Sequence, residues 1–156
     1  MKLYIIRHGE TSWNKAKKLQ GRKDIMLDAD GIRLAELTGE GMKDIEFDLV
    51  ISSPLMRARQ TAELVLAGRE IPMITDKRII EMSFGKWEGE SVRHSEIVTE
   101  EFADKFFHDP YHCPKAPGGE SFRDVLERTA DFYQSLIKNQ AYKDANILIS
   151  THGAAS

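Results

Sequence analysis

The sequence contains a single cysteine and no long apolar segment. With only Cys113, the chain cannot form an internal disulfide. No apolar run approaches the roughly 20 residues of a membrane-spanning helix. The apolar residues near the N-terminus stop at Arg7, which is too early for the core of a secretory signal. These features favour a cytoplasmic protein without membrane attachment.

Positive charge is also scarce. The formal net charge is −3 at pH 7, which argues against a nucleic-acid-binding protein. The charge is uneven: residues 1–60 carry 11 Lys and Arg against 9 Asp and Glu, and residues 61–156 carry 11 against 16. An anion site is therefore expected in the first part. The length and the 41% apolar content suit one globular domain over residues 1–156.

Short apolar runs alternate with helical patterns along the chain. Strands are expected at residues 2–7, 47–51, 71–75 and 147–150. The run from Leu3 to Ile6 has the composition of a fully buried strand, whereas Pro72 places its strand towards a sheet edge. The alternation predicts an α/β fold with a mostly parallel sheet flanked by helices.

Helix boundaries are predicted from capping residues. We expect Asp30 to cap a first long helix that ends near Gly39 or Gly41. Ser53 is expected to cap a second helix, which begins at Pro54 and ends near residue 67. One or two helices are expected within residues 92–107, and residues 108–120 have the composition of a loop. Ser121 and Asp124 form a capping-box pattern before a strongly periodic helix.

Three of the predicted strands end in polar residues suited to catalysis. These ends are Arg7-His8-Gly9, Ser52-Ser53-Pro54 and Thr151-His152-Gly153. Parallel strands place their carboxyl ends at one edge of a sheet, where α/β proteins bind ligands. Histidine can act as a nucleophile, and arginine matches the planar geometry of phosphate oxygens. The pattern predicts phosphoryl chemistry on a histidine, with Arg57 and Glu81 as further candidates for anion binding and proton transfer.

A series of short segments strengthens this prediction. In chain order they are Arg7-His8-Gly9-Glu10-Thr11, Trp13-Asn14, Gln20-Gly21-Arg22, Asp24-Ile25-Met26-Leu27, Gly31, Ser52 to Ala62, Glu81, Phe84-Gly85, Trp87-Glu88-Gly89, Pro117-Gly118-Gly119-Glu120-Ser121 and Thr151-His152-Gly153. In these segments the chain resembles the histidine phosphatase superfamily, also called phosphoglycerate mutase-like, over essentially its whole length. The likeness is greatest to the α-ribazole phosphatase or broad-specificity branch, whose members continue with further elements after the last strand.

The resemblance implies a role for each matching residue. His8 would attack phosphorus and become a phosphohistidine, and Glu81 would give a proton to the leaving alkoxide. The oxygens of the phosphoryl group would be bound by residues near His8: Arg7, Arg57, His152, Asn14, Thr11, Gln20 and Gly21. The implied substrate is a small phosphorylated metabolite. Neither a metal nor a cofactor is implied, because the protein supplies the cations.

Within the family, residues 90–116 favour a phosphatase over a mutase. They supply three Lys and Arg residues against six Asp and Glu residues, whereas a mutase needs extra cations around a polyanionic substrate. The alternatives are phosphoglycerate mutase activity and an impaired phosphate-binding protein. The second alternative rests on the short segment after His152, which would leave apolar strand surface exposed and favours a homo-oligomer.

Two other groups of residues have open interpretations. His108, His112 and Cys113 have loosely metal-like spacing, but Pro110 breaks any helix that would align them, so no metal site is expected there. Phe102, Phe106 and Phe107 either line the site or belong to the core, and the same holds for Trp13 and Trp87.

Overall fold

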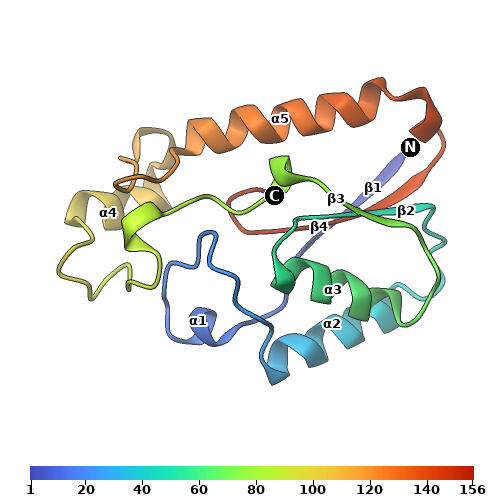
Figure 1. Ribbon diagram of the computed structural model, residues 1–156, viewed down its shortest axis with the longest axis horizontal. Coiled ribbons are helices and arrows are strands. Elements are labelled where there is room, and N and C mark those ends of the chain that lie inside the picture. The colour runs from blue at the N-terminus through green and yellow to red at the C-terminus, as the bar shows by residue number, and fades with distance from the viewer.

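A four-stranded parallel sheet lies at the centre of the computed structural model, which describes residues 1–156 (Figure 1). Its strands are β1 (Lys2–Arg7), β2 (Leu49–Ser52), β3 (Met73–Thr75) and β4 (Asn146–Thr151), in the spatial order β1-β4-β2-β3. Every neighbouring pair is parallel. The predicted α/β fold with a parallel sheet is confirmed, and all four carboxyl ends meet at one edge.

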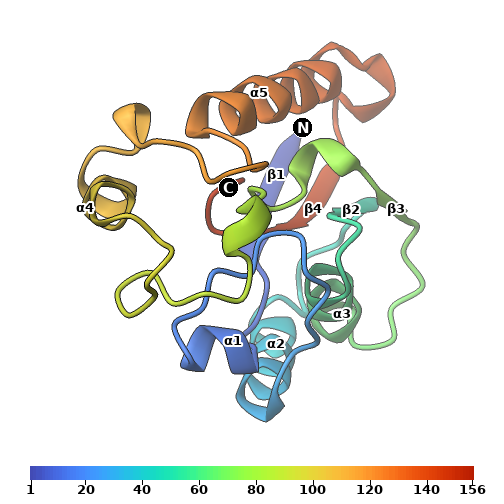
Figure 2. The same ribbon diagram turned by 60° about the vertical axis from the view of Figure 1, so that its left-hand side comes forward.

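Helices cover both faces of the sheet (Figures 1 and 2). On one side lies α5 (Phe122–Lys138), and on the other lie α2 (Ala29–Gly41) and α3 (Met56–Leu66). Successive residues of β4 alternate between the two layers, so Ile147 packs with Phe132 of α5, whereas Leu148 packs with Ala62 of α3. This arrangement explains why the middle of β4, from Ile147 to Ile149, is apolar.

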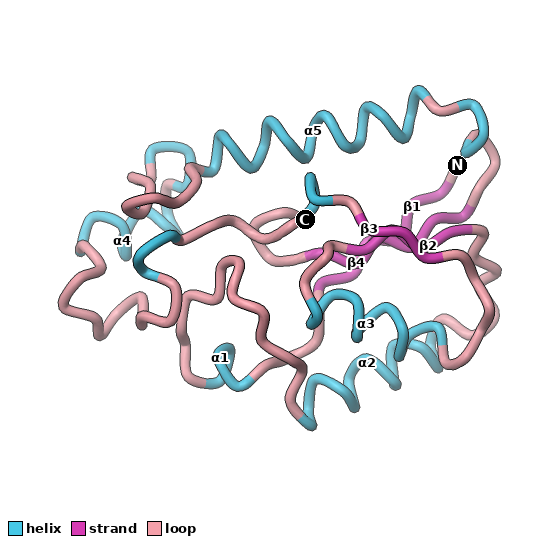
Figure 3. Tube along the Cα trace, viewed as in Figure 1, coloured by secondary structure: helices cyan, strands magenta, loops and turns pink.

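The remaining helices lie beyond the carboxyl edge of the sheet, among long loops (Figure 3). They are α1 (Ser12–Lys15) and α4 (Glu100–His108), with 3₁₀ turns at Lys77–Ile79, Gly85–Trp87 and Pro110–His112. This region has its own apolar cluster around the fully buried Phe102. A further 3₁₀ turn at Gln140–Tyr142 lies at the other end of the sheet, beside the N-terminus and just before β4. None of the helices is long and apolar enough to cross a membrane.

The prediction that residues 3–6 form a fully buried strand is wrong. β1 is an edge strand that pairs only with β4, and Ile5 on it is 47% exposed. The apolar run reflects partial cover by the helices rather than burial on both faces. An unpaired strand edge can pair with another chain, so self-association stays a prediction. The placement of Pro72 beside the opposite edge strand, β3, agrees with expectation.

Two predicted helix starts are corrected. The cap of α2 is Asp28 and not Asp30, because the Asp28 carboxylate accepts the N–H of Gly31. α3 begins at Met56 without any side-chain cap, so neither Ser53 nor Pro54 has the expected role. Residues 92–107 contain one helix, α4, which extends to His108.

The structure confirms the capping box of α5. The Ser121 hydroxyl accepts the N–H of Asp124, whose carboxylate accepts the N–H of Ser121. The predicted second strand also has different limits, because Phe47 and Asp48 precede β2 and Ser52 belongs to it.

The start of α2 lies directly against the loop that follows β1. A Cβ atom on Gly31 would lie 2.1 Å from the carbonyl oxygen of Glu10, and one on Gly9 would lie 2.5 Å from the carbonyl oxygen of Gly31. Real side chains do not tolerate such distances to rigid backbone. The two glycines therefore let α2 fix the position of the loop that carries His8.

We expect Gly31→Ala to destabilise the protein by about 2 kcal/mol or more, because the new methyl group displaces the backbone at Glu10. For a chain of this size that loss corresponds to a fall of roughly 4–8 °C in Tm. Thermal unfolding followed by circular dichroism measures it.

Gly41→Ala is the matched control on the same helix, because a Cβ atom there meets nothing within 4 Å. It should leave stability unchanged or raise it by up to about 1 kcal/mol through helix propensity. Equal shifts in the two variants would contradict the close backbone contact.

Candidate active site

The sheet places the three polar strand ends next to one another. Two hydrogen bonds extend the ladder past the strands: His8 N–H donates to the Thr151 carbonyl at 3.0 Å, and Ser53 N–H donates to the Ser150 carbonyl at 2.9 Å. The ring centroids of His8 and His152 are consequently 5.1 Å apart. The structure thus brings together the residues that the sequence placed at one edge.

His8 is held as a neutral imidazole. Its Nδ1 lies 2.7 Å from the Gly9 carbonyl oxygen, which can only accept a hydrogen bond, so Nδ1 carries the proton. The pKa of His8 is lowered to about 4, chiefly by burial; the Gly9 hydrogen bond opposes this shift, and the charges of Arg57 and Arg7 add to it. The sequence predicted that the arginines lower the pKa of His8, but burial is the larger cause. Nε2 is left with a free lone pair at neutral pH.

His152 is completely buried behind His8. Its Nε2 lies 2.7 Å from the Ser53 hydroxyl oxygen, and its Nδ1 has no partner in the protein. Burial, together with the charge of Arg57, lowers the pKa of His152 well below its usual value. The ring is therefore neutral and offers hydrogen bonding rather than charge. The hydroxyl of Ser53, expected to cap a helix, instead fixes this imidazole.

The Arg57 guanidinium is fully buried and holds a loop in place. It donates from Nη1 to the Lys23 carbonyl and from Nη2 to the Gly21 carbonyl, both at 2.8 Å. Its Nε has no partner. Arg57 thus ties residues 21–23 to α3 beside His8, a structural role that sequence patterns did not indicate.

Arg7, unlike Arg57, is an exposed residue. Its side chain is exposed to the cavity described below and packs against Gly153, where a Cβ atom would lie 3.4 Å from the guanidinium carbon. No carboxylate forms a salt bridge with it. Its donors are free to bind an anionic ligand.

Glu81 provides a carboxyl group in a nearly enclosed position. The residue is 9% exposed, and its Oε1 accepts the N–H groups of Met82 at 2.8 Å and Ala154 at 3.3 Å. Burial raises the pKa of Glu81, although these hydrogen bonds and the charges of Arg57 and Arg7 oppose the shift. Oε2 accepts no hydrogen bond from the protein and can carry a proton.

Asn14 lines the cavity because of an N-terminal capping box on α1. Its Oδ1 accepts the backbone N–H of Thr11 at 3.0 Å and the Thr11 hydroxyl at 2.9 Å. With Oδ1 occupied, the amide NH₂ of Asn14 is the group available to a ligand. Thr11 is fully buried and does not line the cavity, so its hydroxyl serves the cap and is not placed to contact phosphate as the resemblance implied.

A cavity of about 730 Å³ lies beside His8. Its lining includes most of the predicted site residues: Arg7, His8, Asn14, Gln20, Gly21 and Glu81. Arg57 and His152 lie behind this lining, against His8 and the 21–23 loop. The cavity therefore combines a nucleophile, an acid and unpaired cationic donors.

The loops around the cavity are bonded to each other. Leu19 and residues 89–90 exchange two backbone hydrogen bonds of 2.8 Å. Glu88 Oε1 accepts the N–H of Arg22 at 3.0 Å and that of Phe84 at 3.2 Å. The segment that carries Gln20 and Gly21 and the segment that follows Glu81 thus form one wall.

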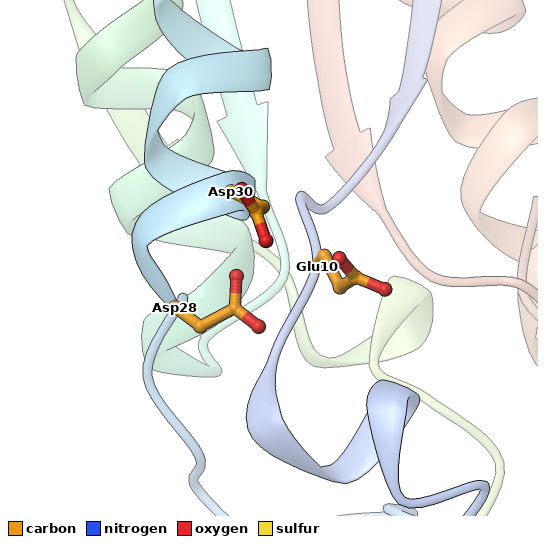
Figure 4. A group of neighbouring side chains, drawn as sticks. All are labelled: Glu10, Asp28 and Asp30. Carbon is orange, nitrogen blue, oxygen red and sulfur yellow. The ribbon is translucent and has the colours of Figure 1, made fainter.

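One group of carboxylates lies close enough together to suggest a cation site, namely Glu10, Asp28 and Asp30 (Figure 4). The ammonium group of Lys15 already occupies this position, 3.0 Å from Asp28 and 2.5 Å from Asp30. The protein thus supplies the positive charge there.

His108, His112 and Cys113 do not converge on a common point. His108 Nδ1 bonds to the Asp104 carbonyl, His112 pairs with Asp109, and the Cys113 thiol is buried against the Phe102 carbonyl. Each side chain of the group is directed to a different partner.

The comparisons with known proteins agree with this geometry. Residues 3–156 match the histidine phosphatase superfamily (branch 1), and the chain belongs to this family. It is 34% identical over 151 residues to the uncharacterized phosphatase PhoE of Bacillus subtilis, covering 97% of this chain and 71% of that protein. It is 35% identical to the adenosylcobalamin/alpha-ribazole phosphatase of Escherichia coli, covering 97% and 73%.

A solved structure supports the same family assignment. Bacillus stearothermophilus YhfR superimposes with a TM-score of 0.87 at 36% identity, covering 98% of this chain and 74% of that one. Other relatives are named probable phosphoglycerate mutases. The family thus includes both phosphatases and mutases, and this chain is shorter than these members.

The lowered pKa of His8 predicts a loss of stability in acid. Between pH 6.5 and about 4, the unfolded chain binds a proton on His8 that the folded chain does not. Folding stability should therefore fall as the pH drops through this interval, by about 3 kcal/mol from this group. Urea unfolding of the wild type and of His8→Gln at several pH values measures the difference, since the variant should lose less stability.

Gly41→Ala is the control, because it removes no titratable group and a Cβ atom there meets nothing within 4 Å. The pH dependence of its stability should equal that of the wild type. If His8→Gln also behaved like the wild type, the neutral, buried state of His8 would be contradicted.

Proposed function

We propose that this protein hydrolyses phosphomonoesters through a phosphohistidine on His8. The observation that carries the proposal is the neutral His8 ring, whose Nδ1 proton is held by Gly9 and whose Nε2 lone pair is free. A carboxyl group and an unpaired guanidinium line the same cavity. This is the set of groups that phosphoryl transfer without a metal requires.

The first step uses these groups in turn. Nε2 of His8 attacks phosphorus, and the bond from phosphorus to the ester oxygen breaks. Arg7 and the Asn14 amide, which line the cavity, donate hydrogen bonds to the phosphoryl oxygens. Behind this lining, Nε of Arg57 and Nδ1 of His152 are buried without a partner in the protein, which sets them apart from the Thr11 hydroxyl and supports them as further contacts. Oε2 of Glu81 gives its proton to the departing alkoxide, so the alcohol leaves neutral.

The second step reverses the role of Glu81. Its carboxylate takes a proton from a water molecule that attacks phosphorus on His8. The bond from Nε2 to phosphorus breaks, phosphate leaves, and both residues return to their starting protonation states. The raised pKa of Glu81 suits a group that must alternate between the two states near neutral pH.

Hydrolysis is favoured over mutase activity, but for a different reason from the acidity of residues 90–116. None of the carboxylates of that segment lines the cavity, and its only charged lining residue is Arg93, apart from the titratable His94. The net acidity of residues 90–116 therefore does not determine the charge of the cavity. The preference for hydrolysis rests on the size of the cavity: about 730 Å³ leaves room for a water molecule beside the phosphoryl group, which hydrolysis needs and a mutase must prevent.

The second candidate, phosphoglycerate mutase activity, is supported by Lys17, Lys18 and Arg93 on the cavity lining. These cations could hold a second phosphate group. Incubation with 3-phosphoglycerate, with and without 2,3-bisphosphoglycerate, separates the two functions. Interconversion of phosphoglycerates that depends on the bisphosphate would favour the mutase over the phosphatase.

The proposal predicts that Glu81→Gln affects substrates according to their leaving group. Turnover of ethyl phosphate should fall by roughly 10²–10⁴-fold, because the alkoxide needs a proton. With 4-nitrophenyl phosphate, whose leaving group needs none, a burst of nitrophenolate should persist in rapid-quench experiments and phosphoenzyme should accumulate.

Two controls complete this experiment. His8→Ala should give no burst and no acid-labile phosphoenzyme, and Glu127→Gln, an exposed carboxylate on α5, should match the wild type. Phosphate binding by the wild type without turnover of any ester would instead identify an impaired phosphate-binding protein.

A further inference from the structure

The carboxylate of Glu120 joins segments that are distant in the sequence. Its Oε1 accepts a hydrogen bond from Nη2 of Arg22 at 2.8 Å, and Nε and Nη2 of Arg128 bind its two oxygens at 3.1 and 3.2 Å. Its Oε2 also accepts the backbone N–H of Ser83 at 2.9 Å. Glu120 therefore connects the loop beside the cavity and α5 to the segment that follows Glu81.

The loop that carries Glu120 packs closely against the backbone of Ser83. The N–H of Glu120 donates to the Ser83 carbonyl at 2.9 Å, and the N–H of Lys86 donates to the Pro117 carbonyl at 3.1 Å. A Cβ atom on Gly119 would lie 2.5 Å from the Ser83 carbonyl oxygen, so glycine permits this close approach. Both the N–H and the carbonyl of Ser83 are thus bonded to the same residue, Glu120.

This contact bears on the position of Glu81, because Ser83 is only two residues away. The N–H of Met82 donates to Oε1 of Glu81 at 2.8 Å, and the next N–H along the chain, that of Ser83, donates to Glu120. A rotation of the backbone at Ser83 would therefore move the donor that orients the Glu81 carboxyl group. The other donor to Glu81, the N–H of Ala154, is more distant at 3.3 Å.

The pairing with Arg128 makes the position of Glu120 rigid. Arg128 binds the carboxylate with two of its nitrogens and donates from the third, Nη1, to the Arg78 carbonyl at 2.7 Å. The side chains of Arg128 and Glu120 are 16% and 18% exposed, so solvent screens this pair less than a surface pair. Neither residue lines the cavity, and any effect of Glu120 on the reaction must pass through other residues.

We propose that Glu120 is a positioning residue for proton transfer: its carboxylate holds the backbone at Ser83 and thereby places the acid, Glu81, in the cavity. This inference rests on the proposed phosphatase function and adds a residue that none of its steps uses. Because Glu120 acts through Glu81, its loss should slow the release of a leaving group that needs a proton and spare one that needs none.

The test uses Glu120→Gln, which keeps the size of the side chain but removes the charge that the arginines bind. We expect kcat for ethyl phosphate to fall roughly tenfold or more, because the acid is displaced. KM should change little, since Arg7 and Asn14 still bind the phosphoryl group. The burst of nitrophenolate from 4-nitrophenyl phosphate should stay within about twofold of the wild type. Partial unfolding would instead lower both activities together.

A double-mutant cycle shows whether Glu120 acts through Glu81. In the Glu81→Gln background, Glu120→Gln should cause no further loss with ethyl phosphate, because no acid remains to be positioned. Glu127→Gln is the matched control, since it removes one exposed carboxylate of α5 and should leave turnover unchanged. Independent losses from the two substitutions would overturn the positioning role.

Carbon-13 NMR of the Glu81 carboxyl group gives a readout that does not depend on turnover. Burial raises the pKa of Glu81, against the charges of Arg57 and Arg7, which both variants retain. If Glu120→Gln lets the carboxyl group move towards water, the pKa of Glu81 should fall, whereas Glu127→Gln should not change it. An unchanged pKa of Glu81 in Glu120→Gln would contradict the proposed placement.

The outcomes separate the two proposals. A lower pKa of Glu81 in Glu120→Gln, without hydrolysis of either ester by the wild type, would support the placement of Glu81 by Glu120 and overturn the phosphatase function. Hydrolysis of both esters by the wild type, with equal losses for both in Glu120→Gln, would overturn the positioning role while supporting the phosphatase function.

Discussion

The parallel pairing of β4 with both β1 and β2 is the constraint on which the site depends. β4 is apolar because both of its faces are covered, and this burial gives the sheet a fixed register. The ladder continues one residue past each strand, so His8, Ser53 and His152 come to adjacent positions. A shift in this register would separate the two imidazoles.

Burial at the carboxyl edge of the sheet also shifts the pKa values of the reactive side chains. The same desolvation lowers the pKa values of His8 and His152, which keeps both rings neutral, and raises the pKa of Glu81. Positive charge remains available from Arg7, which is exposed, and Arg57, which is buried. The two arginines therefore differ in function. Arg7 is open to a ligand, whereas Arg57 holds the loop at residues 21–23.

The sequence predicted the sheet and the convergence of the strand ends, because both follow from local composition and parallel topology. It did not predict that β1 lies at an edge, since an apolar run does not reveal how many neighbours a strand has. It also missed the close approach of Gly31 to Glu10 and the loop bonded by Arg57, because these contacts join distant segments. The acidity of residues 90–116 was misleading, since composition does not show which side of a helix faces the cavity.

We propose that Nε2 of His8 receives the phosphoryl group because Gly9 holds the proton on Nδ1. Phosphorus NMR of the Glu81→Gln phosphoenzyme, with isotopically labelled imidazole nitrogens, tests it most directly. We expect a coupling between phosphorus and Nε2 of His8. Phosphorus on Nδ1, on His152 or on no histidine would contradict it.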